Sequence, residues 1–316
     1  MSSASNKIRI GTRASNLALA QVAEVHLLLA DHLQGREIEI VPITTSGDKI
    51  QDRNLADIGG KALFIKELEE SLIQGKIDVA IHSAKDVPPT LHEDTYISAF
   101  TERLDAHDCL ISKNFNSLEE LPEGAVIGTS SARRKAILLC LRPDLNIVNF
   151  RGNVDTRLTK VNNEDVDASI LASCGLERVG KNHLAKQIIS KEIMLPAGGQ
   201  GALAIQIKKD NQEMFDLFKN INHEKTQICI KSERAFLREL GASCATPVSV
   251  HAHFESASLD SEVVNLETMI LDYDGTDVFK TESQSNPNLE DAIKLGTEAA
   301  KKTKKEAADL LKKICQ

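Results

Sequence analysis

Residues 76–84 read "KIDVAIHSA", and this stretch decides the fold class. Apolar side chains occupy both of its alternating faces, which is typical of a central strand in a parallel sheet that helices cover on both sides. Lys85 and Asp86 follow the apolar run directly. The strand therefore delivers two adjacent, opposite charges to one edge of the predicted sheet.

The first part of the chain alternates strands and helices around that stretch. Residues 7–12 and 36–43 predict short strands. Residues 17–33 and 61–74 predict helices, because their apolar positions recur at helical spacing and a glycine follows each of them closely. Such alternation indicates a lobe built on a parallel sheet.

A second block repeats this plan. Residues 125–143 predict a strand, a Gly-Thr-Ser turn and a helix, and they share the letters "IGT" with residues 10–12. Residues 145–161 and 166–180 each predict a strand that leads into a polar turn. The repeat indicates two related lobes, whose ligand sites should lie beyond the carboxyl ends of the strands.

The pattern changes after residue 220. A helix is expected at about 222–240, followed by three antiparallel strands within residues 246–285, with a hairpin turn at Asp274-Gly275. A charged amphipathic helix is expected from about Leu289 to Ile314. This part predicts a smaller α+β domain.

The composition disfavours several classes of protein. A net charge of −8, with 3% aromatic residues and no Trp, disfavours nucleic-acid binding. The N-terminus lacks the apolar region of a secretory signal and no stretch approaches a membrane span, so we expect a soluble, cytoplasmic protein. The six cysteines form no C-x-x-C pair, which argues against a disulfide framework and against a metal site of the zinc type.

Six arginines gather where predicted strands end and helices begin. Free backbone N–H groups at helix N-termini favour anions, and the guanidinium fork pairs with carboxylate or phosphate. Pairing with nearby Glu and Asp is the simpler explanation for any one arginine, but six at the same topological position predict a cleft for a ligand with many negative charges. The arginines are Arg13, Arg133, Arg134, Arg151, Arg157 and Arg178, accompanied by the hydroxyl groups of Ser15, Thr129, Ser130 and Ser131.

Two further residues are candidates for chemistry. Asp86, if it lies in such a cleft, could stabilise a cationic intermediate or shuttle a proton, although an ion pair with Lys85 or a turn cap is the simpler reading of that pair alone. Cys244 lies in the small-residue loop "ELGASCATPV" and could attack an electrophile. The preceding helix points its negative end at this loop, which should raise the pKa of the thiol.

Seven ordered motifs resemble the porphobilinogen deaminases, also called hydroxymethylbilane synthases, over essentially the whole chain. They are "GTRASNLALAQ", "GGKALFIKELE", "AIHSAKDVP", "IGTSSARRKA", "FRGNVDTRL", "PAGGQGALAI" and the cysteine loop. The resemblance implies a transferase that joins four porphobilinogen molecules head to tail, releases ammonia at each step and yields hydroxymethylbilane. It also implies a dipyrromethane cofactor joined to Cys244 by a thioether.

The resemblance assigns roles to individual residues. Asp86 is implied as the catalytic carboxylate. The implied cofactor-binding residues are Ser83, Lys85, Thr129, Ser130, Ser131, Arg133, Arg134, Arg157 and Gln200, and the implied substrate-binding residues are Arg13, Ser15, Lys61, Arg151 and Arg178.

The resemblance also implies the domain organisation. The family fold has two lobes similar to periplasmic anion-binding proteins, here residues 5–101 with 202–219 and residues 107–195, and an α+β domain, here residues 222–316, and its members are usually monomers. The chain departs from the common pattern at Ala242-Ser243, at Asp57 and at Gly198.

Two other functions fit the pattern of charges. One is a non-catalytic two-lobe anion-binding protein, and the other is an enzyme that acts on a phosphorylated metabolite with Lys85 and Asp86 as acid and base. The former gives Cys244 no role, and the latter predicts no covalent adduct.

Overall fold

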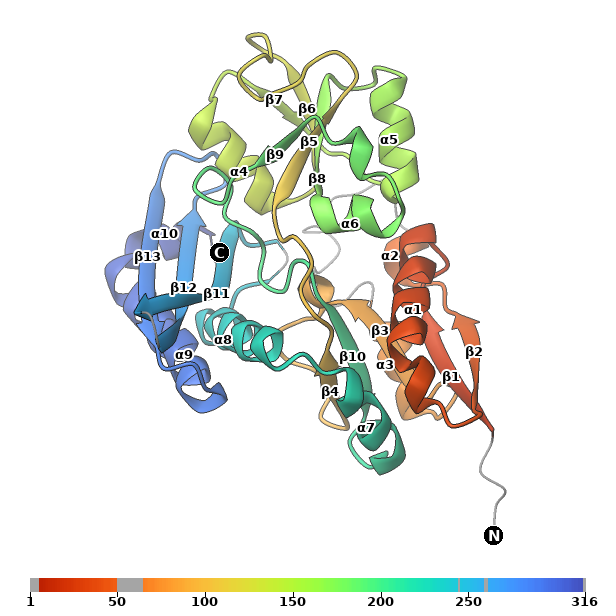
Figure 1. The fold of residues 1–316 in the computed structure, drawn as a ribbon. Coiled ribbons are helices and arrows are strands. Elements are labelled where there is room, and N and C mark those ends of the chain that lie inside the picture. Colours follow the sequence, from red (N-terminus) through yellow and green to blue (C-terminus); the bar gives the residue numbers. More distant parts are fainter. Residues whose placement is uncertain (1–5, 50–64, 244, 259–260, 315–316) are drawn as a thin grey trace.

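The computed structural model describes residues 6–49, 65–243, 245–258 and 261–314. These residues form two lobes, each around a five-stranded mixed sheet, and a third part around a three-stranded antiparallel sheet (Figure 1). The predicted fold class is confirmed.

The first lobe has the strand order β2-β1-β3-β10-β4. Its strands are β1 (Lys7–Thr12), β2 (Glu37–Pro42), β3 (Val79–Ser83), β4 (Thr95–Phe100) and β10 (Leu203–Lys208), and its helices are α1 (Asn16–Leu29), α2 (Ser46–Lys49), α3 (Lys66–Ile73) and α7 (Gln212–Phe218), with 3-10 turns at Ala30–His32, Ala84–Asp86 and Lys219–Ile221. Val79 and Ile81 of β3 pack with α1, whereas Ala80 packs with α3. The strand of residues 76–84 is therefore covered on both faces, as predicted.

The second lobe repeats this arrangement with the order β7-β6-β8-β5-β9. Its strands are β5 (Asp108–Ser112), β6 (Val126–Gly128), β7 (Asn146–Val148), β8 (Ala168–Ala172) and β9 (Gln187–Ile189), and its helices are α4 (Ala132–Leu141), α5 (Val154–Asn162) and α6 (Ser173–Arg178), with a 3-10 turn at Asn182–Leu184. In each lobe four strands run in one direction, and the fourth in spatial order runs antiparallel to them. The shared "IGT" ends β1 in the first lobe and spans the end of β6 and the following Thr129 in the second, and these two strands occupy equivalent places.

The chain crosses between the lobes twice, through residues 101–107 and 190–202. The two crossings touch at Gly201, whose φ is +102° and whose added Cβ would lie 2.5 Å from the carbonyl oxygen of Leu104. After the second crossing, β10 enters the first lobe between β3 and β4 and runs antiparallel to both. Each crossing therefore leads directly into the antiparallel strand of the lobe that it enters, which is β5 in the second lobe and β10 in the first.

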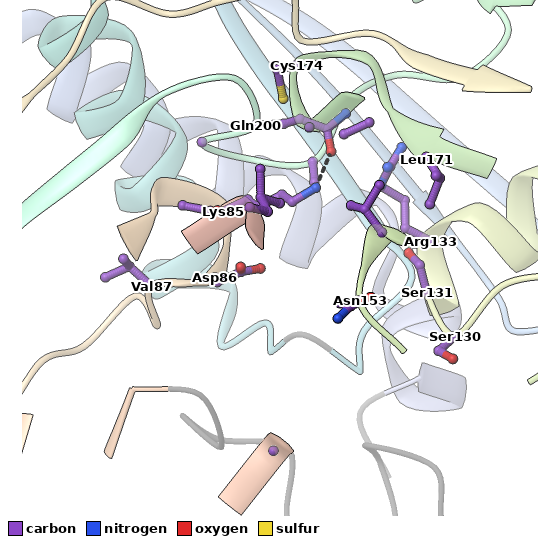
Figure 2. Close-up of a pocket in the computed structure, with 18 of the residues that line it drawn as sticks. Lys85, Asp86, Val87, Ser130, Ser131, Arg133, Asn153, Leu171, Cys174 and Gln200 are labelled. Carbon is purple, nitrogen blue, oxygen red and sulfur yellow. Dashed lines mark hydrogen bonds between the residues drawn. The ribbon is translucent and has the colours of Figure 1, made fainter. Parts of the chain in front are cut away.

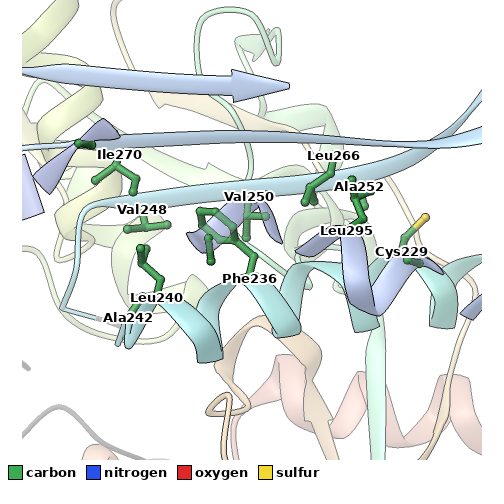
Figure 3. Close-up of a cluster of buried hydrophobic side chains, with 14 of the residues drawn as sticks. Cys229, Phe236, Leu240, Ala242, Val248, Val250, Ala252, Leu266, Ile270 and Leu295 are labelled. Atoms are coloured by element: carbon green, nitrogen blue, oxygen red, sulfur yellow. The ribbon is translucent and has the colours of Figure 1, made fainter. Parts of the chain in front are cut away.

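The third part consists of α8 (Glu224–Leu240), β11 (Val248–Ser258), β12 (Ser261–Leu271), β13 (Val278–Ser285), α9 (Leu289–Glu306) and α10 (Ala308–Ile314). Figure 3 shows Phe236 of α8 against Val250 and Leu266 of the sheet, and these side chains belong to one buried cluster with Leu295 of α9. Met269 and Leu271 on β12 instead join the core of the second lobe. Both faces of this small sheet are therefore covered.

The C-terminal helix differs from its prediction. One helix was expected from about Leu289 to Ile314, but α9 ends before Ala307, where φ is −111° and ψ is 30°, and α10 begins at Ala308. The break lets Leu310 and Ile314 turn into the apolar cluster that α9 already covers. Burial of these side chains explains the break, because a straight helix would keep one apolar stripe along a single direction.

Among the described helices, none combines the length and the apolar run needed to cross a bilayer. Within the same described residues, no group of three or more His, Cys, Asp or Glu side chains could hold a metal ion.

Candidate active site

A cavity of about 630 Å³ lies where the two lobes and the third part meet, and Figure 2 shows part of its wall. Thirteen of the sequence-predicted site residues line it. These are Arg13, Ser15, Ser83, Lys85, Asp86, Ser130, Ser131, Arg133, Arg134, Arg151, Arg157, Arg178 and Gln200. All six arginines that were expected at strand ends therefore converge on one cavity, together with one lysine.

Three predicted residues are not placed on this wall. Thr129 is buried beneath it, and its hydroxyl accepts a hydrogen bond from the backbone N–H of Ser131. Lys61 and Cys244 lie outside the described residues, as does Asp57. The neighbours of Cys244 in its loop, Ala242, Ser243 and Thr246, do line the cavity.

Asp86 ends the 3-10 turn that follows β3, and its side chain is half-buried at the cavity wall. The turn is fixed from behind, because the N–H of Ala84 donates to the carbonyl of Ala202 at 3.0 Å. Gly199 lies against the same turn, and an added Cβ there would be 2.8 Å from the carbonyl carbon of Ala84. Among the described residues, no hydrogen bond or ion pair engages the Asp86 carboxylate. It is thus a free acceptor at a cationic wall.

Lys85 takes a different direction from Asp86 (Figure 2). Its Nζ donates to Oε1 of Gln200 at 3.0 Å, and no hydrogen-bonded ion pair with Asp86 forms. Burial lowers the pKa of Lys85, and repulsion by Arg134 lowers it further. The structure therefore does not form the ion pair that was the simpler reading of these two neighbours alone, and both side chains line the cavity.

Arg133 and Arg134 share one buried carboxylate. Nη2 of Arg133 and Nη2 of Arg134 each donate to Asp108 at 2.6 Å, and Asp108 is fully buried. Burial alone would raise the pKa of Asp108, but attraction to Arg133 and Arg134 outweighs it and holds that pKa well below its usual range. Two of the six arginines are therefore partly neutralised within the wall. For these two arginines, the simpler explanation given above, pairing with a nearby Glu or Asp, therefore holds.

Gln200 links this pair to Lys85. Its Nε2 donates to Asp108 Oδ1 at 2.9 Å and to the carbonyl of Ala106 at 2.7 Å, while its Oε1 accepts from Lys85. Because both amide hydrogens and the amide oxygen are engaged, the orientation of Gln200 is determined by the network. The network spans both crossings, since Ala106 and Gln200 lie on different ones.

Arg157, unlike Arg133 and Arg134, has no carboxylate partner among the described residues, so its charge is available to a ligand. Its Nε donates to the carbonyl of Gly152 at 2.9 Å, and no salt bridge joins it to a carboxylate among the described residues. Burial, together with repulsion by Arg134 and Arg151, lowers the pKa of Arg157 to about 10. Arg151 reaches the first lobe, where its Nη2 donates to the carbonyl of Gly47 at 3.3 Å. Placing a carboxylate-rich ligand here would relieve this repulsion.

Arg178 connects the two lobes. Its Nε donates to Glu24 Oε2 of α1 at 2.7 Å, and its Nη2 donates to the carbonyl of Gly201 at 2.9 Å. Arg178 therefore has a carboxylate partner across the cleft in addition to its place on the cavity wall.

The hydroxyl groups at the cavity also have local roles. Ser15 caps α1 by accepting from the N–H of Ala18, and Ser131 caps α4 by accepting from the N–H of Arg134. Ser83 accepts a hydrogen bond from Nε2 of Gln21 at 2.7 Å. The caps made by Ser15 and Ser131 orient helix N-termini, and each of these hydroxyl groups still has its hydrogen to donate.

Sequence reasoning missed Asp108, Gln21 and Glu24. Asp108 stands at the start of the apolar run "DCLIS", and a carboxylate entering a fully buried strand is a signal that a cation accompanies it. Gln21 and Glu24 look like ordinary polar positions of an amphipathic helix. Nothing in their spacing distinguishes them.

The residues present fit a dipyrromethane group. Each pyrrole of that group carries two acidic side chains, and the cavity wall supplies guanidinium groups, the ammonium group of Lys85 and serine hydroxyls. Arg157 and Lys85 carry pKa values lowered by burial and by like charges, which an anionic occupant would reverse. The cysteine loop borders the same cavity through Ser243 and Thr246.

Gly198, one of the departures from the family pattern, is closely packed. An added Cβ would lie 2.9 Å from Val250 Cγ1 and 3.0 Å from Leu237 Cδ1. A valine there would require these two side chains to move, so glycine suits the packing of this chain.

Comparison with known proteins identifies the family. The model of the porphobilinogen deaminase dipyromethane cofactor binding domain matches residues 8–216, and the model of the porphobilinogen deaminase C-terminal domain matches residues 227–305. The porphobilinogen deaminase of Rickettsia bellii is 46% identical over 94% of this chain and 97% of its own, and that of Nitrobacter winogradskyi is 42% identical over 95% and 93%. Among solved structures, the methionine-binding protein MetQ has a TM-score of 0.44 at 17% identity, covering 68% of this chain and 89% of that one. The chain belongs to the porphobilinogen deaminase family.

Proposed function

We propose that the cavity is the active site of a hydroxymethylbilane synthase, a transferase that condenses four porphobilinogen molecules head to tail and releases ammonia at each step. The observation that carries this proposal is the convergence of six arginines and Lys85 around the unengaged carboxylate of Asp86. Cations bind the acidic side chains of the pyrroles, and one carboxylate serves the reacting ring. A non-catalytic anion-binding protein would have no use for that carboxylate, so this alternative is not favoured.

Asp86 acts on the substrate ring. Loss of ammonia leaves a positive charge on the pyrrole, and a carboxylate at hydrogen-bond distance stabilises that charge and accepts the pyrrole N–H. Because Asp86 has no partner among the described residues, it is available for this contact without breaking another. The wall cations hold the acidic side chains of the substrate and so orient the ring.

Dipyrromethane is held between the lobes, with most of its contacts from the second lobe. We assign it to Arg133, Arg134, Arg157 and Lys85, with Ser83, Ser130, Ser131 and Gln200 as polar contacts, and Thr129 supports Ser131 from below. When bound, the group supplies the pyrrole end to which the first substrate unit is joined. Cys244 is its proposed point of attachment, supported by the position of its neighbours at the cavity.

The substrate and the growing chain are assigned to Arg13, Ser15, Arg151 and Arg178, with Lys61 as a further contact. We also propose three domains with the boundaries 5–101 plus 202–219, 107–195 and 222–316. The pairing of β10 with β3 and β4 supports the return of the chain to the first lobe. A monomer that acts in the cytoplasm completes the proposal.

Intact mass spectrometry and turnover test the proposed function together. The purified wild-type chain should exceed its sequence mass by two linked pyrrole units, and Cys244→Ser should lack this excess. Asp86→Asn should keep the folded structure and the mass excess but lose nearly all turnover, about 100-fold or more, because the neutral amide stabilises a cation poorly. An unmodified and fully active wild-type protein, or wild-type rates in Asp86→Asn, would contradict the proposal.

A further inference from the structure

The segment that follows Asp86 is held by one side chain from outside its lobe. Arg234 of α8 donates from Nη1 to the carbonyl of Val87 at 3.0 Å and from Nη2 to the carbonyls of Pro88 and Pro89 at 2.7 and 3.3 Å. A single planar guanidinium therefore engages three consecutive peptide carbonyls. Because the prolines have no N–H and a restricted φ, these contacts leave the segment little freedom.

An apolar contact from the same helix face reinforces this hold. Ile230 is fully buried in a cluster that contains Ala84 and Val87. Residues four apart share one face of a helix, so Ile230 and Arg234 reach the first lobe side by side. Together they bracket Asp86, with contacts to the residue two before it and to the three residues after it.

The charge of Arg234 is met by carbonyl dipoles. Among the described residues no carboxylate forms a salt bridge with it. Burial, with repulsion by Arg238, lowers the pKa of Arg234 to about 10. A partly buried cation without an ionised partner contributes little net stability. The hydrogen bonds of Arg234 to residues 87–89 therefore explain its position better than a contribution to stability does.

The helix that carries Arg234 also leads to the attachment loop. Three residues beyond Arg234, Leu237 lines the cavity, and α8 ends at Leu240, directly before the loop that contains Cys244. The residue directly before Arg234, Glu233, accepts a hydrogen bond from the N–H of Gly199 at 2.7 Å, and Gly199 lies against the Asp86 turn. One rigid helix thus touches the turn of the carboxylate, the second crossing and the cysteine loop.

We propose that Arg234 is a positioning residue for Asp86, and that it holds the carboxylate at a constant place relative to the loop of Cys244. The inference rests on the role proposed above for Asp86. Without the guanidinium, residues 87–89 lose their anchor and the carboxylate moves away from the reacting ring. Arg234 does not line the cavity, so the cations that bind the pyrrole acids stay in place.

Steady-state kinetics of the cofactor-carrying enzyme test this inference. Arg234→Met keeps the length and apolar stem of the side chain but removes its charge and donors, and it should lower kcat about 10- to 100-fold while KM for porphobilinogen stays within about twofold. Arg234→Lys keeps the charge and one donor group, and its kcat should lie between the two. Arg238→Gln is the matched control, since it removes an exposed charge one turn later, and its kcat should equal that of the wild type.

A double-mutant cycle shows whether Arg234 acts through Asp86. In the Asp86→Asn background, Arg234→Met should lower the residual turnover by less than about threefold, because the group that it positions is already disabled. An equal drop in both backgrounds would show that Arg234 acts independently of Asp86 and would overturn the inference.

Melting temperature and the mass excess of two pyrrole units are measured for every variant. If Arg234→Met does not fold, Arg234→Lys decides: a folded lysine variant with reduced kcat supports the inference, and one with wild-type kcat refutes it. If neither folds, Arg234 is a structural residue and the inference is wrong. Wild-type turnover in Asp86→Asn would remove the proposed function itself, whereas wild-type turnover in Arg234→Met alone would remove only this inference.

Discussion

The buried carboxylate of Asp108 accepts hydrogen bonds from Arg133, Arg134 and Gln200. Two guanidiniums so close together would repel each other in an empty low-dielectric wall, and the carboxylate offsets that repulsion. Asp108 also lies at the first residue of β5, directly after the first crossing. It therefore stabilises the cationic wall and joins the wall to the connection between the lobes.

Asp108→Asn should lower the free energy of unfolding by about 3 kcal/mol, because it leaves two buried cations without their counter-charge. The fraction of protein that carries the mass excess should also fall. Since the folded pKa of Asp108 is depressed, its stabilisation is present above the unfolded pKa near 3.8 and is lost only as pH falls toward the folded value.

Urea unfolding between pH 8 and pH 5 checks this expectation. The difference in free energy of unfolding between the wild type and Asp108→Asn should stay constant over that range and become smaller only at lower pH. A gap that changes between pH 8 and pH 5 would assign the effect to another titrating group.

At the scale of elements, the 3-10 turn of Ala84–Asp86 depends on the close approach of the second crossing. Gly199 has a φ of +79°, and an added Cβ would lie 2.9 Å from the backbone nitrogen of Lys85. Both backbone conformation and space therefore require glycine. Gly180 shares the conformation, with a φ of +68°, but an added Cβ there meets nothing within 4 Å. Substitution of Gly180 therefore tests backbone strain alone, whereas substitution of Gly199 tests backbone strain together with steric crowding.

Gly180→Ala should cost about 1 kcal/mol of stability through its left-handed backbone and should keep wild-type turnover. Gly199→Ala should cost more and should lower kcat about tenfold, because the added methyl group displaces the turn that ends at Asp86. Thermal unfolding and steady-state kinetics measure both. Equal stability losses and equal turnover in the two variants would mean that the crossing does not position the turn.

Most elements could be predicted from periodicity. The strand of residues 7–12 and the helix of residues 222–240 correspond closely to β1 and α8. The place of β10 between β3 and β4 could not be derived in this way, because pairing partners that are far apart in the chain, such as Leu203 and Ser83, leave no trace in local spacing. The break at Ala307 was missed for the same reason, since it depends on the cluster that receives α10.

At the scale of the whole molecule, the chain is acidic overall while its cavity is lined by cations. A cationic cavity between low-dielectric walls attracts anions, and dissolved salt weakens this attraction. We therefore expect KM for porphobilinogen to rise severalfold between roughly 20 and 300 mM KCl, with a much smaller change in kcat. Initial rates at several substrate concentrations measure both. A KM independent of salt would mean that the wall charges are neutralised before substrate binds.

The types and order of most candidate site residues could be predicted from the sequence, and so could the convergence of the arginines on one cavity. Strand ends in a parallel sheet face one edge, so residues at those ends must gather there. The partner of each charged side chain could not be predicted from the sequence. Whether a guanidinium faces an anion, a carbonyl or another guanidinium depends on residues that are distant in the chain, such as Asp108 for Arg133 and Glu24 for Arg178.

The sequence by itself determined the lobes, the small C-terminal domain, the family and thirteen of the residues that line the cavity, because periodicity, turn residues and ordered motifs are local properties of a chain. Only the tertiary structure decided which charges are engaged, how the two crossings meet at Gly201, and that Arg234 of one part holds the turn of Asp86 in another. Hydrogen bonds and electrostatic interactions act through space, over distances that chain spacing does not record.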